Sequence, residues 1–156
     1  MKTIYHYNSP IGTLKLVCSN EALEELTFCT CKAQNTQNLP QIILTCKEQL
    51  DSYFKGELRE FDIPIKFSKG TPFQQSVWQE LAKIPYGQTK SYKEIATSIN
   101  NPKAVRAVGG ANNKNPISII IPCHRVIGAD GKLVGYGGEL WRKEFLLNLE
   151  KKALKS

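Results

Sequence analysis

The sequence predicts a mixed α/β (α+β) protein of two domains, the second of which is mostly helical and contains a helix-turn-helix. Two observations support this fold class: strand-like alternation of apolar residues in the first half and helical spacing in the second half. We place the domains at residues 1–68 and 69–156, because Ser68-Lys69-Gly70-Thr71-Pro72 is rich in turn-forming residues.

The first domain combines strand and helix patterns. Leu14, Leu16 and Cys18 alternate with polar residues, which is typical of a half-buried strand. Residues 41–55 gather apolar side chains on one helical face, and Gly56 follows as a stop. Alternation returns over residues 61–67, and Pro64 within that stretch favours an edge strand.

The second domain opens with a helix. Thr71 is a good N-cap, Pro72 suits the first helical position, and apolar spacing carries the helix to Pro85. A short helix over residues 91–99 and another from Lys103 are separated by a tight break, which is the helix-turn-helix pattern.

Two further elements are expected near the C-terminus. Residues 117–121 form a β-branched run that predicts a buried strand. The last helix is predicted over residues 139–149, with Trp141, Phe145 and Leu149 on its apolar face.

The helix from Lys103 has an unusual composition. Val105 and Val108 are expected to face the core. A second face carries Arg106, Gly109, Gly110 and Asn113. Two glycines inside a helix cost about 1 kcal/mol each relative to alanine, so a compensating gain is expected. A bare face permits close approach to a DNA groove, or alternatively to another helix.

Charge is unevenly distributed along the chain. Residues 1–68 hold seven Lys and Arg against eight Asp and Glu, whereas residues 69–156 hold fourteen against six. A basic second domain favours a polyanionic partner such as DNA, although a solvated lysine-rich surface has the same composition.

Cys123 and His124 follow the apolar run directly. A cysteine becomes a nucleophile when a base or cation favours its thiolate. Glu150 could orient the histidine ring from the last helix. Taken singly, the cysteine could also be a buried small residue, and the histidine and the glutamate could be surface residues.

The run IPCHRVIG, preceded by KAVRAVGGANNKNP and followed by GYGGELWRKEFLLNLE, resembles the O(6)-alkylguanine–DNA alkyltransferase family. The resemblance is close over residues 69–150 and looser at the N-terminal SPIGTLKLV. It implies an RNase H-like first domain and a winged-helix-like second domain. It also implies direct reversal of DNA damage, in which an alkyl group moves once, irreversibly, from oxygen-6 of guanine to a cysteine.

The resemblance assigns roles residue by residue. Cys123 matches the acceptor, His124 the base that acts through a water, and Glu150 the carboxylate that orients it. Asn115 matches the residue that supports the active-site turn, and Tyr92 the proton donor to guanine.

The same resemblance implies a DNA-binding helix and a guanine pocket. Arg106 matches the residue that fills the gap left by a flipped nucleotide. The recognition helix, which enters the minor groove in this family, contributes Ala107, Gly109, Gly110 and Asn113, with Tyr92 beside it. The pocket walls correspond to Ser118, Val126, Tyr136 and Gly137. Ser118 stands where some members have proline, and Gly137 where some have serine.

The expected partner is double-stranded DNA containing alkylated guanine, bound by a monomer. We expect no cofactor and no metal, because the CTC motif at 29–31 does not reproduce a zinc spacing. Without a signal peptide or a membrane span, we expect a cytoplasmic protein, associated with the nucleoid if prokaryotic, with reduced thiols. A non-catalytic alkylguanine binder, a helix-turn-helix regulator and a thiol hydrolase remain alternatives.

Overall fold

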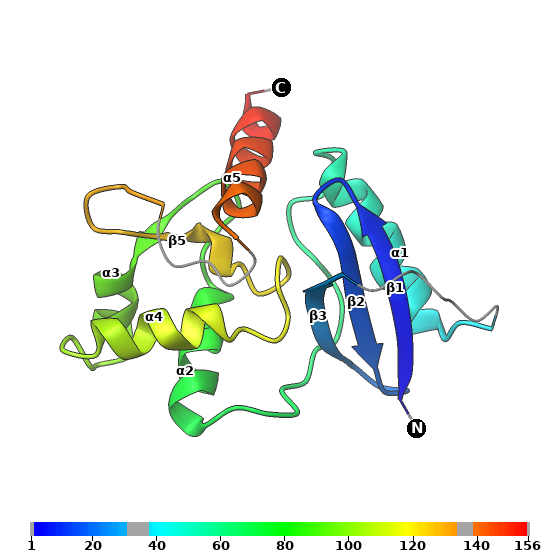
Figure 1. The fold of residues 1–156 in the computed structure, drawn as a ribbon, viewed down its shortest axis with the longest axis horizontal. Helices are drawn as coiled ribbons and strands as arrows, with labels where there is room; N and C mark the ends of the chain where they lie inside the picture. The colour runs from blue at the N-terminus through cyan, green and yellow to red at the C-terminus, as the bar shows by residue number, and fades with distance from the viewer. Residues whose placement is uncertain (1, 31–37, 134–138, 156) are drawn as a thin grey trace. The chain divides into compact units, whose positions relative to one another are not determined.

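The computed structural model describes residues 2–30, 38–133 and 139–155. The chain divides into two compact units, Met1–Ser68 and Lys69–Ser156, each with its own secondary structure (Figure 1). Among the helices of the described residues, none is long and apolar enough to cross a membrane.

The first unit is built on a three-stranded antiparallel sheet in chain order. Its strands are β1 (Thr3–Ser9), β2 (Gly12–Cys18) and β3 (Leu23–Cys29). Leu14, Leu16 and Cys18 of β2 are fully buried, so the strand predicted from their alternation is confirmed.

The helix α1 (Gln41–Phe54) contacts β1 and β2 and agrees with the predicted helix (Figure 1). It buries Ile43, Cys46, Leu50 and Tyr53. Gly56, two residues after the helix, has a φ of 77°, a left-handed conformation that favours glycine. The left-handed backbone at Gly56 therefore explains why this glycine follows the end of the helix.

The strand predicted over residues 61–67 is wrong. Only Ile65 pairs, in an isolated parallel bridge to Leu23. The Leu23 amide donates to the Pro64 carbonyl at 2.8 Å, and the Lys66 amide donates to the Leu23 carbonyl at 3.0 Å. Proline has no amide hydrogen, so Pro64 cannot donate to a ladder.

The cysteines of this unit differ from one another. Cys18 and Cys46 are buried free thiols, whereas Cys29 is disulfide-bonded. The expectation of reduced thiols is therefore wrong for Cys29.

The second unit begins with α2 (Pro72–Leu81). The predicted N-cap is confirmed. The backbone N–H of Gln74 donates to the Thr71 hydroxyl, and the backbone N–H of Thr71 donates to the side-chain oxygen of Gln74. The helix ends at Leu81 rather than at Pro85, because the Ile84 amide donates to the Leu81 carbonyl in a tighter turn.

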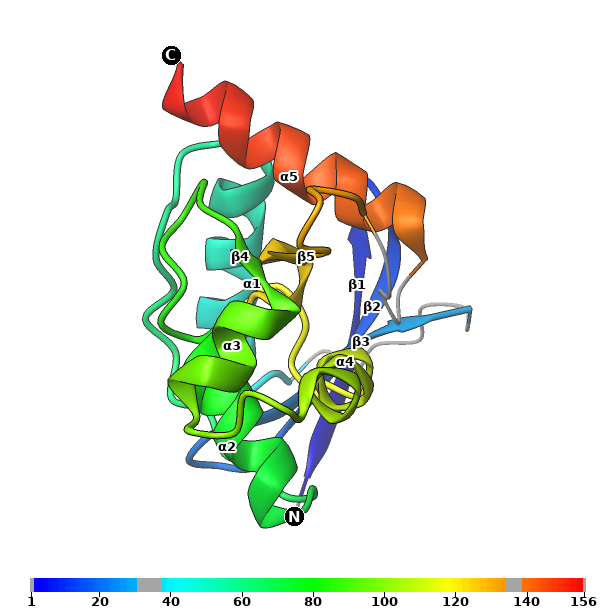
Figure 2. The same ribbon diagram turned by 90° about the vertical axis from the view of Figure 1, so that its left-hand side faces the viewer.

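The predicted helix-turn-helix is formed by α3 (Tyr92–Ser98) and α4 (Val105–Asn113). The helices α3 and α4 pack against each other, and each also packs against α2 (Figure 2). The Trp78 indole N–H donates to the Ala111 carbonyl at 2.8 Å in the buried core of these helices. This bond fixes α4 relative to α2.

The run predicted as a strand at 117–121 is a tight turn instead. The Ile121 amide donates to the Ile117 carbonyl at 3.0 Å, and Ile119 has a φ of 72°. The three isoleucines at 117, 119 and 121 are nonetheless buried. The burial of this run was predicted correctly, but its strand conformation was not, because a short apolar run does not by itself define the backbone conformation.

A 3-10 turn, η1 (Cys123–Arg125), follows. The two-residue strands β4 (Lys90–Ser91) and β5 (Val126–Ile127) then pair in parallel. The last helix, α5 (Leu140–Leu154), begins near the predicted start and continues five residues beyond the predicted end at 149.

The predicted apolar face of α5 is wrong. Trp141 is 50% exposed and Phe145 is 37% exposed. The buried residues of α5 are Lys143, Leu146 and Glu150, which share a face at a spacing of three and four. The helix therefore turns two charged side chains inward.

Candidate active site

The turn before Cys123 is held by hydrogen bonds of the Asn115 side chain. Its side-chain amide donates to the Ile121 carbonyl at 2.8 Å, and its side-chain oxygen accepts from the Ile117 amide at 3.0 Å. Asn112, buried on α4, donates to the Cys123 carbonyl at 3.4 Å. These bonds fix the entry into η1 and thereby the position of the thiol.

Glu150 is buried and gathers hydrogen bonds from three directions. Its Oε2 lies 2.6 Å from His124 Nε2 and 3.0 Å from Arg125 Nη2. Its Oε1 accepts from Arg125 Nε at 2.8 Å and from the Gly87 amide at 3.1 Å. Arg125 also donates to the Ile84 carbonyl at 2.8 Å. Glu150 is therefore not a surface residue, and that alternative is excluded. Arg125 belongs to the same hydrogen-bonded cluster, but it was not predicted from the sequence.

The charge states within this cluster follow from the geometry. Burial alone would raise the pKa of the Glu150 carboxyl, but the hydrogen bonds and charges of His124 and Arg125 hold it well below its usual range. Burial lowers the pKa of His124, and this effect exceeds the opposing effect of Glu150. At neutral pH the imidazole is therefore neutral and the carboxylate is charged.

The tautomer of His124 follows from the same contacts. A carboxylate only accepts, so Nε2 carries the hydrogen that lies between His124 and Glu150. Nδ1 is then an unprotonated acceptor. It is buried and makes no hydrogen bond within the described part of the chain. The site thus holds a base with an available lone pair on the residue next to Cys123.

Cys123 is 3% exposed and is a free thiol. Burial raises its pKa, while the Asn115 side chain and the Lys143 charge act in the opposite direction. The thiol at rest therefore holds its proton and needs a base to become a thiolate.

Tyr92 and Lys143 complete the surroundings of the thiol. Lys143 is fully buried, and its ammonium donates to the Tyr92 hydroxyl at 3.5 Å. Burial and the proximity of Cys123 raise the pKa of Tyr92 to about 12. Lys143 was not predicted. The available signal was its helical spacing from Glu150, which places both on one face of α5.

The glycine face of α4 is open. Arg106, Ala107, Gly110 and Asn113 are exposed and Gly109 is partly exposed. Val108 is buried, but Val105 is 37% exposed, so the prediction that both valines face the core is wrong for Val105.

Packing within the described residues does not require a glycine at position 109 or at position 110. A Cβ added to Gly110 would meet nothing within 4 Å, and one added to Gly109 would lie 4.0 Å from the Tyr92 ring, an ordinary contact. Within the described residues, close approach of a second helix therefore does not require these glycines.

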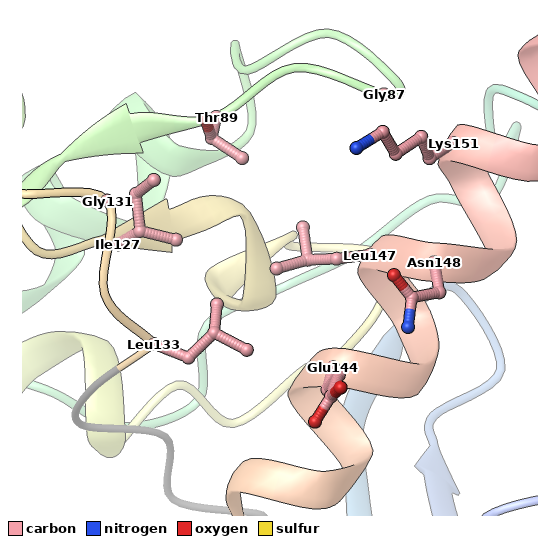
Figure 3. Close-up of a pocket in the computed structure, with 9 residues that line it drawn as sticks. All are labelled: Gly87, Thr89, Ile127, Gly131, Leu133, Glu144, Leu147, Asn148 and Lys151. Atoms are coloured by element: carbon pink, nitrogen blue, oxygen red, sulfur yellow. The ribbon is translucent and has the colours of Figure 1, made fainter.

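The predicted guanine-pocket residues are only partly described. Val126 is fully buried and Ser118 is 9% exposed. Tyr136 and Gly137 lie outside the described residues. A separate pocket of about 430 Å³ is lined by Gly87, Thr89, Ile127, Gly131, Leu133, Glu144, Leu147, Asn148 and Lys151 (Figure 3). Neither Val126 nor Ser118 is among these lining residues.

Within the described ranges, no three His, Cys, Asp or Glu side chains are grouped so that they could hold a metal ion.

A unit with a helix-turn-helix and a buried cysteine beside a neutral base belongs to a protein that combines DNA binding with thiol chemistry. Residues 72–152 match the model of the DNA-binding domain of 6-O-methylguanine DNA methyltransferase, and residues 3–67 match its ribonuclease-like domain. The chain therefore belongs to the 6-O-methylguanine DNA methyltransferase family, and the resemblance seen in the sequence is confirmed.

Relatives and solved structures agree with this assignment. The methylated-DNA–protein-cysteine methyltransferase of Methanosarcina barkeri is 49% identical over 154 residues, covering 94% of this chain and 96% of its own length. A crystal structure of the O6-methylguanine methyltransferase of Mycobacterium tuberculosis shares 47% identity, with a TM-score of 0.87, 98% of this chain covered and 94% of that one. A structure of Mycobacterium tuberculosis OGT in complex with DNA is 49% identical with the same TM-score, over 97% of this chain and 94% of that one.

Proposed function

We propose that this chain repairs alkylated DNA by moving the alkyl group from oxygen-6 of guanine to Sγ of Cys123, once per molecule. The observation that carries the proposal is the hydrogen bond between His124 and Glu150. It leaves Nδ1 unprotonated on the residue adjacent to a buried free thiol. A water placed at Nδ1, as the family resemblance implies, would carry the thiol proton to His124.

The reaction follows from the chemistry of these groups. Once Cys123 is a thiolate, its sulfur attacks the alkyl carbon and the carbon–oxygen bond breaks. Glu150 stabilises the imidazolium formed at His124. The electron pair goes to guanine, which leaves as a neutral base when a proton reaches it. We assign the donation of that proton to Tyr92, whose hydroxyl interacts electrostatically with Cys123. The thioether has no hydrolysable bond, so the protein acts once.

DNA is bound by the second unit, and we assign residues 69–156 as the DNA-binding and alkyl-acceptor domain and residues 1–68 as the RNase H-like domain. The open face of α4 suits the minor groove of double-stranded DNA. A base in a duplex must be flipped out to react. Arg106, exposed on that face, would fill the gap.

The flipped guanine would occupy a pocket near Cys123. Val126 and Ser118 are described parts of its wall, and Tyr136 and Gly137 are assigned to it by resemblance. The protein would act as a cytoplasmic monomer without cofactor or metal, associated with the nucleoid through DNA in a prokaryote.

A labelled substrate separates this function from its alternatives. Duplex DNA with a labelled methyl group on guanine oxygen-6 is mixed with the protein, and the label is followed. Transfer to a Cys123-containing peptide is expected. Label that stays on DNA indicates a binder, and label released as a small molecule indicates a hydrolase.

Two variants make the assignment specific to one sulfur. Cys123→Ala should abolish transfer but keep binding of methylated duplex. Cys46→Ala removes another buried free thiol and should transfer normally. Undiminished transfer by Cys123→Ala would refute the acceptor.

A further inference from the structure

Asn112 on α4 is buried beside the acceptor cysteine, and one end of its side-chain amide is unused. The residue is 1% exposed, and its Nδ2 donates to the Cys123 carbonyl at 3.4 Å. A carbonyl oxygen only accepts, so the end of the amide that faces Cys123 is the nitrogen. The other end, Oδ1, is buried and makes no hydrogen bond within the residues that the structure describes.

A buried acceptor without a donor destabilises a folded protein. Such an atom has lost its water and has gained no partner in return, and buried side-chain polar atoms in native proteins are nearly always hydrogen-bonded. Leucine has a shape similar to that of asparagine and would avoid the penalty at Asn112. The asparagine is therefore explained if a donor reaches Oδ1 when the protein binds its substrate.

The position of Asn112 connects the DNA-binding face to the acceptor. Arg106 and Asn113 on the same helix are exposed and belong to the face proposed for the minor groove. The side chain of Asn112 instead lies on the buried side of α4 and contacts the backbone of Cys123. A nucleotide that leaves the groove beside α4 and reaches Cys123 would bring its base to this amide.

The chemistry of alkylated guanine offers one kind of donor to such an acceptor. An alkyl group on oxygen-6 fixes the ring in the form in which N1 carries no hydrogen. N1, N3, N7 and the alkylated oxygen can then only accept. The amino group at carbon 2 carries the remaining N–H bonds of the base, and it is the donor that distinguishes guanine in the minor groove.

We propose that Oδ1 of Asn112 accepts a hydrogen bond from the 2-amino group of the flipped guanine, so that Asn112 determines substrate specificity. This inference rests on the proposed function. Enzymes that flip a base read it by hydrogen bonds to its edge. Thymine alkylated on oxygen-4 has neither an amino group nor a ring N–H, so it would leave Oδ1 unpaired and would be repaired more slowly.

The two ends of the Asn112 amide have complementary tasks. The bond from Nδ2 to the Cys123 carbonyl holds the plane of the amide against the turn that carries the thiol. This bond keeps Oδ1 at a fixed place relative to the acceptor sulfur. An acceptor that is already oriented binds its donor without a further loss of side-chain freedom.

Two benzyl donors that differ only at carbon 2 test the contact. Benzylguanine carries the amino group, and benzylhypoxanthine carries a hydrogen in its place; both are alkylated at oxygen-6. Rates of benzylation of the Cys123 peptide are measured by mass spectrometry for the wild type, for Asn112→Leu and for Asn148→Leu. Asn148 is an exposed asparagine on α5 and serves as the matched control.

The informative quantity is the ratio of the benzylguanine rate to the benzylhypoxanthine rate. A displaced thiol or a smaller folded fraction slows both donors equally and leaves this ratio unchanged. Asn112→Leu should lower the ratio by about tenfold, the effect of one hydrogen bond on a transition state, and Asn148→Leu should not change it. An unchanged ratio in Asn112→Leu would overturn the inference. Wild-type protein that gains no benzyl group from either donor would refute the proposed function itself.

A complex with DNA provides a test that needs no change at Asn112. The Cys123→Ala variant is crystallised with duplex DNA that contains guanine methylated on oxygen-6. The 2-amino nitrogen of that guanine should lie within hydrogen-bond distance of Asn112 Oδ1, about 3.5 Å or less. A longer separation, with the base in place beside position 123, would overturn the inference even if Asn112→Leu does not fold.

Discussion

Replacing Glu150 with glutamine keeps the size of the side chain and removes its charge. The carboxylate accepts from Arg125 twice, from the Gly87 amide, and from His124. Glutamine would present an amide N–H₂ to donors on one side. Arg125, whose side chain is 8% exposed, would become a buried charge without its partner.

The expected loss of stability is large. Removing one partner of a buried ion pair costs about 3–5 kcal/mol. For a chain of this length each kcal/mol shifts Tm by about 2–4 °C, so Glu150→Gln should lower Tm by roughly 6–20 °C. Glu144→Gln, an exposed carboxylate on the same helix, should change Tm by less than about 2 °C.

The pH dependence provides a second observable. The folded pKa of Glu150 lies below its ordinary value, so its contribution is complete above about pH 4.3 and is lost as pH falls through the folded pKa. The folded pKa of His124 is also lowered, so stability begins to fall below about pH 6.5. The difference in Tm between wild type and Glu150→Gln should therefore shrink below about pH 4.

Thermal melts followed by circular dichroism, at pH 7 and at steps down to pH 3, check both expectations. Arg125→Met combined with Glu150→Gln removes the unpaired charge and should be no less stable than Glu150→Gln alone. A decrease in Tm no larger than that of Glu144→Gln would show that the cluster does not stabilise the fold, and the reasoning would fail.

Three further predictions concern DNA and the product. Gly110→Ala should raise Tm by about 2–4 °C, because the added Cβ meets nothing within 4 Å and alanine favours the helix by about 1 kcal/mol. The same variant should slow repair of duplex DNA, and an unchanged duplex rate would argue against close approach of DNA to α4. Arg106→Ala should slow duplex repair much more than transfer from free benzylguanine, and equal losses would place Arg106 in the pocket or the fold instead. Protein benzylated at Cys123 should melt at a lower temperature than free protein in the same buffer, because added volume in a packed site costs about 1–3 kcal/mol; an equal or higher midpoint would contradict this.

Local signals in the sequence determined much of the structure. The Thr71 cap, the strand at Leu14–Cys18 and the helix before Gly56 were predicted from spacing and turn chemistry, and the structure confirms them. The motif around Cys123 was specific enough to indicate the family before any geometry was known. Such features depend on residues close together in the chain, where propensity and capping dominate.

Tertiary structure decided which way the last helix faces. Trp141 and Phe145 suggested an apolar buried stripe, yet the helix buries Lys143 and Glu150 and exposes the aromatic residues. Burying these charges is possible only because η1 and α3 supply His124, Arg125 and Tyr92 as partners. Those partners lie between 25 and 51 positions away in the sequence, so periodicity within the helix carries no information about them. The free energy of a buried charge depends on what surrounds it in space, and this is why the site residue Lys143 could be found only in the folded chain.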